Sequence, residues 1–216
     1  MTIQTMSLKK KIALSFLISS AIIAMLAAFE YLSFVEIRKE IRYLELTDTV
    51  SRKSLQLRRH EKNYFLYSPL KSSDESLAVY AYLKELNDIL ARNPDIDRAD
   101  QLSLRMRISD YEQRFSKIES SAMSLMLLFE KTKVGDKRKA QFFNLVESTF
   151  LEQPLLSAEF LQKAVRLPPS HMLITGLREL DSDITALRKT GEDILVISKD
   201  LDKIAREKVE TVIRVS

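Results

Sequence analysis

Apolar residues recur with helical spacing along most of this chain, after one long apolar segment near its start. Residues 12–29 carry no charged side chain, Glu30 interrupts, and residues 31–35 extend the apolar character. A helix of about 20 such residues spans the hydrocarbon core of a bilayer. Neither Gly nor Pro occurs within residues 9–67. The pattern therefore predicts one continuous helix that crosses a membrane at residues 12–34 and continues beyond it.

The charge before the apolar segment predicts its orientation. Lys9, Lys10 and Lys11 precede it directly, and such clusters stay on the cytoplasmic side of the inner membrane. We expect residues 1–11 in the cytoplasm and residues 35–216 outside, in the periplasm or its equivalent. A cleaved signal peptide is the competing interpretation. The length of the apolar segment and the large Leu26 at the would-be cleavage site disfavour it.

Proline, glycine and capping residues divide the rest of the chain into five further predicted helices. The second helix of the chain begins at Ser73 or Asp74 and stops at Pro94, and the third stops at Gly135. A fourth is expected over residues 138–152, with a break or kink at Pro154. A short fifth covers residues 155–167, and the last begins at a Ser170 cap and continues to the end of the sequence.

Apolar seams with alternating spacings of four and three predict that the long helices pack side by side at shallow angles. The fold class is therefore all-α: an elongated antiparallel bundle, or two stacked bundles. The last helix is expected to return antiparallel to the first, its stripe drifting after Ile194. It stops amid an amphipathic pattern, so we expect a second membrane helix and a cytoplasmic output region in the parent protein. The seam of the third helix reads Leu104, Ile108, Tyr111, Phe115, Ile118, Ala122, Leu125 and Phe129, and that of the last reads Leu173, Leu177, Leu180, Ile184, Leu187, Gly191, Ile194, Ser198, Leu201, Ala205, Lys208 and Val212.

Composition narrows the functional classes. The net charge is +4, of which three charges belong to the lysines before the apolar segment, so no nucleic-acid-binding surface is expected. Three glycines are too few for a phosphate loop, and without cysteine neither disulfides nor thiolate metal sites can form. His60 and His171 lie far apart and fit no zinc motif. We expect no catalytic residue, no metal and no cofactor in this chain, and hence no enzyme.

The first helix carries an unusual cluster of cations. A seam read from Ile37 to Phe65 includes Arg58 and Lys62, four residues apart, with Arg59 and Asn63 as a neighbouring pair. If this stripe faces the bundle interior, its cations need partners, because an isolated buried charge is costly. The internal candidates are acids on facing helices: Glu112, Glu119, Asp181 and Asp183. The other possibilities are a small external carboxylate, held by the arginines near Tyr64 or Tyr67, and an outward, solvated stripe.

The same stretch resembles a known family. Its sequence, Arg58-Arg59-His60-Glu61-Lys62-Asn63-Tyr64-Phe65-Leu66-Tyr67, is similar to a segment of the helical bimodular sensor domains of bacterial chemoreceptors and sensor histidine kinases. The resemblance implies two stacked helical bundles, a homodimer and, in some members, binding of small organic acids. It implies ligand-side roles for Arg58, Arg59 and Lys62, and we add Asn63 and Tyr64 as candidates.

The sequence thus predicts a membrane-anchored, ligand-sensing domain, in a sensor histidine kinase, that relays a signal by displacement of its first and last helices. A methyl-accepting chemotaxis receptor is the nearest alternative, since it would differ in the cytoplasmic part. An anchored coiled-coil spacer without a ligand is the structural alternative.

Overall fold

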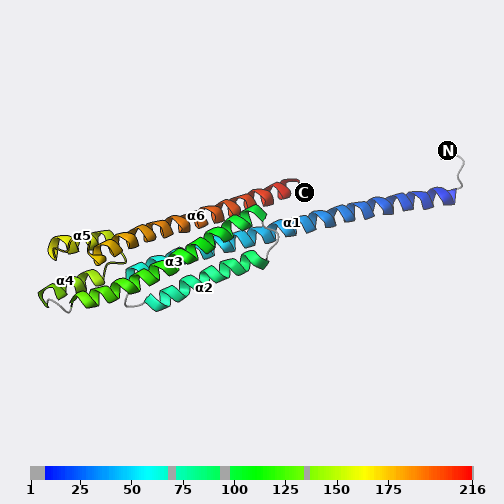
Figure 1. The fold of residues 1–216 in the computed structure, drawn as a ribbon. Coiled ribbons are helices and arrows are strands. Elements are labelled where there is room, and N and C mark those ends of the chain that lie inside the picture. Colours follow the sequence, from blue (N-terminus) through cyan, green and yellow to red (C-terminus); the bar gives the residue numbers. More distant parts are fainter. Residues whose placement is uncertain (1–7, 68–71, 93–97, 134–136, 216) are drawn as a thin grey trace. The chain divides into compact units, whose positions relative to one another are not determined.

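The computed structural model describes residues 8–67, 72–92, 98–133 and 137–215, and these form six helices and no strand (Figure 1). The all-α prediction is confirmed. The expected caps and stops at Ser73, Pro94 and Gly135 lie outside the residues whose side chains are described. The helices are α1 (Leu8–Tyr67), α2 (Ser72–Arg92), α3 (Arg98–Lys133), α4 (Lys137–Glu147), α5 (Pro154–Ala164) and α6 (Met172–Val215).

The chain divides into two units. One comprises Met1–Glu45 and Lys203–Ser216, and the other comprises Leu46–Asp202. In the first unit, the N-terminal part of α1 is long and apolar enough to span a membrane, and none of that apolar window is buried. Exposed apolar area costs about 25 cal/mol per Å² in water, so a lipid environment would favour this segment.

Within residues 46–202, four helices form an up-down-up-down bundle. Residues of α1 meet α6 in reverse order, because Ser54 Oγ lies 3.1 Å from Ser198 Oγ while Phe65, further along α1, lies under Arg188. Helix α2 is antiparallel to α1, with Lys53 and Glu85 paired at 2.5 Å. Helix α6 is likewise antiparallel to α3. Three polar contacts fix that register: Arg107 with Asp193 at 3.5 Å, Asp110 with Thr190 at 3.1 Å, and Lys117 with Asp183 at 2.7 Å.

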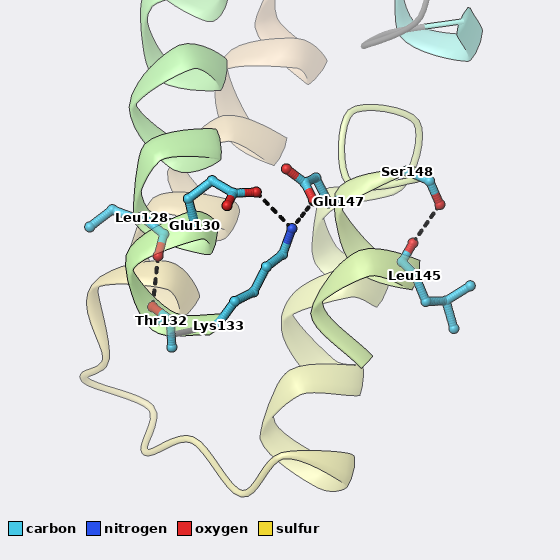
Figure 2. A network of polar contacts seen from close by, with 7 residues as sticks. All are labelled: Leu128, Glu130, Thr132, Lys133, Leu145, Glu147 and Ser148. Carbon is cyan, nitrogen blue, oxygen red and sulfur yellow. Dashed lines mark hydrogen bonds and ion pairs between the residues drawn. The ribbon is translucent and has the colours of Figure 1, made fainter. Parts of the chain in front are cut away.

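Helices α3 and α6 extend beyond α1 and α2 into a second, shorter group that includes α4 and α5. The Phe129 ring of α3 packs against Phe143 and Phe150 at centroid distances of 6.4 Å and 5.5 Å. At the end of α3, Lys133 donates to Glu130 at 2.9 Å and pairs with Glu147 of α4 (Figure 2). Burial alone would lower the pKa of Lys133, but these two carboxylates outweigh it and raise that pKa. These contacts pack α4 and the turn that follows it against the end of α3.

The seams of the third and last helices are largely confirmed. Every predicted seam residue of α3 is buried, with at most 4% of its surface exposed. On α6 the predicted residues from Leu173 to Ala205 are buried, whereas Lys208 is exposed and Val212 is half-buried. The expected drift after Ile194 is wrong, since Ile204 is 42% exposed and the original seam continues through Leu201.

The seam predicted for the first helix is displaced by one residue. The buried residues are Tyr43, Thr47, Val50, Ser54, Leu57, Glu61 and Tyr64. Of the predicted seam, Phe65 alone is buried as expected, at 3% exposed. Two features misled the prediction. Thr47, Ser54 and Glu61 are polar and look like surface residues, whereas Ile41 and Leu55 are apolar but 42% and 48% exposed. One residue turns a helix by about 100°, so this shift moves the predicted interior to the flank.

Two helix boundaries also differ from expectation. Helix α4 ends at Glu147 and is followed by a turn instead of continuing to residue 152, while Pro154 opens α5 at a first-turn position that needs no N–H donor. The cap of α6 is His171 and not Ser170. Its Nδ1 accepts the Leu173 N–H at 3.2 Å, and its carbonyl accepts the Ile174 N–H at 2.8 Å.

Candidate ligand-binding cleft

A cavity of about 570 Å³ lies between α1, α6 and the segment that joins α4 to α5. Three of its lining residues, Arg58, Arg59 and Lys62, belong to the predicted cation cluster. The remaining residues of the lining come from all three segments. They are Leu55, Glu61, Phe65, Leu66, Glu152 and Arg188.

The buried charge in this region is an acid and not a cation. Glu61 is only 2% exposed. Its Oε2 accepts a hydrogen bond from the Tyr111 hydroxyl at 2.6 Å and pairs with Arg58, one turn back on α1. Burial and the Glu61 carboxylate raise the pKa of Tyr111 well above its usual value. The expectation that buried cations are paired by acids on facing helices is corrected: Arg58 is paired within its own helix.

Gly191 of α6 makes room for Arg58. A Cβ at this position would lie 2.7 Å from Arg58 Nη1, 2.8 Å from Arg58 Cδ and 3.1 Å from Tyr111 Cε2. Any side chain here would require the Arg58 side chain to shift. The glycine thus allows α6 to approach the network of Arg58, Glu61 and Tyr111.

Three cations of the cleft differ from Arg58 in having no acidic partner. Within the described part of the chain, neither Arg59, Lys62 nor Arg188 forms an ion pair with a carboxylate. Arg188 Cζ lies 5.7 Å from the centroid of the Phe65 ring, so one face of the guanidinium makes a cation–π contact. With Arg58 and Glu61 neutralising each other, the lining keeps three cations and the exposed carboxylate of Glu152. The cleft is therefore electropositive.

Asn63 and Tyr64, the other two candidates, point away from the cleft. Asn63 donates to Glu75 of α2 at 3.2 Å, and the same carboxylate lies 2.6 Å from His60 Nδ1. Tyr64 is buried with its ring 5.0 Å from that of Phe115. Burial, followed by the charge of Glu119, raises its pKa. These two residues hold α1 against α2 and α3 and do not line the cavity.

Sequence reasoning missed Glu61, Glu152 and Arg188. A seam through Leu57, Glu61 and Tyr64 would have placed Glu61 inside, and its spacing from Arg58 is that of a helical ion pair. Glu152 and Arg188 carry no local signal, because they reach the cleft only through tertiary packing.

No family model, no curated protein and no solved structure matches this chain. Among the described residues, no cluster of His, Asp and Glu side chains is arranged to hold a metal ion. The geometry of the cleft is therefore the basis for a functional assignment.

Proposed function

We propose that this chain is the extracytoplasmic sensor domain of a membrane-bound signalling receptor and that its cleft binds a small organic anion. The observation that carries the proposal is the set of three cations, Arg59, Lys62 and Arg188, that line one cavity without a carboxylate partner. An anion that received hydrogen bonds from them would gain about 1.5–3 kcal/mol from each charged contact. Leu55, Phe65 and Leu66 add apolar surface, as expected for a carboxylate with a carbon skeleton.

The position of these cations suggests how a signal would pass. Arg59 and Lys62 belong to α1, whereas Arg188 belongs to α6. An anion between them would bridge the first and last helices, and a relative shift of about 1–2 Å is typical of such transitions. The ligand acts only if it binds one arrangement of the two helices more tightly than the other. The continuous helix α1 provides a route toward the membrane.

Orientation and output complete the proposal. Lys9 and its two neighbours favour a cytoplasmic N-terminus in the inner membrane. The resemblance of residues 58–67 to helical bimodular sensor domains supports a parent sensor histidine kinase, and it fits a chemotaxis receptor equally. Both outputs require the same sensor domain.

The test is a calorimetric titration of the purified chain, in detergent, with di- and tricarboxylates and amino acids. We expect the Arg59→Ala, Lys62→Ala and Arg188→Ala variants each to weaken binding about tenfold or more. Lys189→Ala is the matched control, because Lys189 is exposed beside Arg188 but does not line the cleft. If no anion binds the wild type, or if Lys189→Ala weakens binding equally, the proposal is wrong and a ligand-free spacer is favoured.

A further inference from the structure

One face of α3 is exposed and uncharged for most of its length. The residues on it alternate at spacings of four and three, nearly opposite the buried seam. All are exposed, among them Leu102 at 60%, Met106 at 64%, Met123 at 69% and Leu127 at 60%. This outer stripe consists of Leu102, Met106, Ser109, Gln113, Ser116, Ser120, Met123 and Leu127.

The other long helices of the bundle have charged outer faces. Arg59 and Lys62 are exposed on α1, Lys84 and Asp88 on α2, and Lys189 on α6. Charged side chains are on α3 as well, but they flank the outer stripe and do not interrupt it. A surface helix that faces only water normally carries charges on that side. The outer stripe instead has the pattern of a coiled-coil seam.

We propose that the outer stripe of α3 is a homodimer interface, where it packs in parallel against the same stripe of a second copy. Numbered as a heptad repeat, the stripe occupies positions a and d. Leucine and methionine stand at its two ends, and serine and glutamine lie between them. The Ser120 hydroxyl already donates to the Ser116 carbonyl at 3.0 Å, so this hydroxyl would keep its partner when a second copy covers it. The apolar ends would supply most of the affinity, and the serines would let the two backbones approach closely.

The flanking charges identify the occupant and its direction. In a parallel coiled coil, the residue at position g, just before an a position, faces position e of the other helix, five residues later in the sequence. Arg105 would then meet Asp110 of the second copy, and Glu112 would meet Lys117 of the second copy. Symmetry doubles both contacts. All four pairs join opposite charges, so the surface is complementary to itself.

An antiparallel pair fits less well. The stripe reads similarly in both directions, with Leu102 opposite Leu127 and Met106 opposite Met123, so its seam residues do not choose a direction. The charged residues that flank the stripe do. In that register Asp110 would still meet Lys117 of the second copy, but Glu112 would lie near Glu119, where like charges repel, and Arg105 would face Met126 instead of an acid. Asp110 and Lys117 can still serve in the parallel pair, because their side chains remain 36% and 66% exposed despite contacts within the chain.

Because the chain has no cysteine, single introduced cysteines can test this interface cleanly. The full chain carrying Met106→Cys or Met123→Cys is expressed in membranes and treated with a mild oxidant. In a parallel dimer each cysteine lies opposite its own copy, within disulfide reach. We expect disulfide-linked dimer roughly tenfold above that of the control Leu77→Cys, which is 68% exposed on α2.

Two results would overturn the proposal. Equal cross-linking of all three variants would mean random collision, and cross-linking only in a mixture of Met106→Cys with Met123→Cys would mean an antiparallel pair. Charge exchange gives a second readout: Glu112→Lys in the Met106→Cys background should reduce the dimer, and adding Lys117→Glu should restore it. A reduction without restoration would contradict the proposed pairing. The interface does not depend on the anion, so the two proposals can fail separately.

Discussion

Glu61 illustrates how a single polar residue can occupy a core position of a helical bundle. Its carboxylate is 2% exposed, yet it receives the Tyr111 hydroxyl and the Arg58 guanidinium. A buried charge is tolerated when such partners replace its hydration. The arrangement also limits Arg58, whose guanidinium is committed to Glu61 and is less available to a ligand than Arg59 or Lys62.

Replacing Glu61 by alanine should destabilise the protein strongly. The change leaves the Tyr111 hydroxyl and Arg58 without their shared acceptor and opens a small cavity, at an expected cost of about 2–4 kcal/mol in the free energy of unfolding. Urea denaturation of the wild type and Glu61→Ala measures this directly. Glu192→Ala is the control, because Glu192 is exposed on α6 and lies outside both the Glu61 network and the outer stripe of α3. A loss as small as that of the control would mean that Glu61 is not buried.

Tyr111 should make the fold sensitive to alkaline pH. Its pKa is raised by burial and by Glu61, so above about pH 10 the unfolded chain loses a proton that the folded chain keeps. The contribution to stability is complete below pH 10 and is lost as pH rises, at roughly 1.4 kcal/mol per pH unit.

Tyr111→Phe should remove this contribution, so that above pH 10 the free energy of unfolding falls less steeply with pH, by roughly 1.4 kcal/mol per pH unit. The measurement is the free energy of unfolding in urea between pH 7 and pH 11.5. At pH 7, where Tyr111 does not titrate, the difference between the two proteins gives the cost of the lost hydrogen bond. The difference in slope at higher pH gives the effect of titration. Parallel curves for the wild type and Tyr111→Phe would contradict the assignment.

At the scale of elements, sequence periodicity predicted the helices best where the buried residues are apolar. The seam of α3 is apolar throughout, and every residue in it is buried as expected. On α1 the true seam contains Thr47, Ser54 and Glu61, so hydrophobicity pointed to the neighbouring stripe. Glu61 and Ser54 also contact Tyr111 and Ser198 on other helices, and these partners cannot be read from the sequence of α1 alone.

Gly191→Ala tests the close approach between α6 and the Arg58 network. Alanine favours a helix over glycine by about 1 kcal/mol. Its Cβ would nevertheless lie within 2.8 Å of two Arg58 atoms, so we expect a net loss of about 1–2 kcal/mol. The same change in an Arg58→Ala background should cost less or become stabilising. An equal cost in both backgrounds, measured by urea denaturation, would exclude the contact as the cause.

The ion pair at the end of α3 joins α4 to α3 (Figure 2). Its two side chains, those of Lys133 and Glu147, are only 14% and 18% exposed. We expect Lys133→Ala to cost about 1–3 kcal/mol, because the Glu147 carboxylate loses its partner. Adding Glu147→Gln should recover part of that loss by removing the charge. Thermal unfolding followed by circular dichroism measures both, and a double variant less stable than Lys133→Ala would contradict this account.

At the scale of the whole molecule, the N-terminal end could be predicted from local sequence, because a helix long and apolar enough to span a membrane depends on one continuous segment. The apolar segment, its exposure and the continuity of α1 all follow from residues adjacent in sequence. The cleft was predicted only in part: Arg59 and Lys62 were found from their spacing, whereas Arg188 and Glu152 reach it from distant segments. A site assembled by tertiary packing has no signature in any one stretch of the sequence.

The last prediction concerns the membrane anchor and its direction. If the apolar segment is an uncleaved membrane helix, the full chain should stay in the membrane fraction after alkaline extraction and should keep its intact mass. A chain shortened by the apolar segment would indicate a cleaved signal peptide instead. For direction, Leu77→Cys places an exposed thiol on α2, away from the outer stripe, and a membrane-impermeant maleimide should label it in spheroplasts. Replacing Lys9, Lys10 and Lys11 by glutamate should reduce that labelling, since clustered positive charges favour a cytoplasmic N-terminus. Labelling of Leu77→Cys only after the membrane is permeabilised would place the bundle on the cytoplasmic side, and a periplasmic or extracellular ligand could then not reach the cleft.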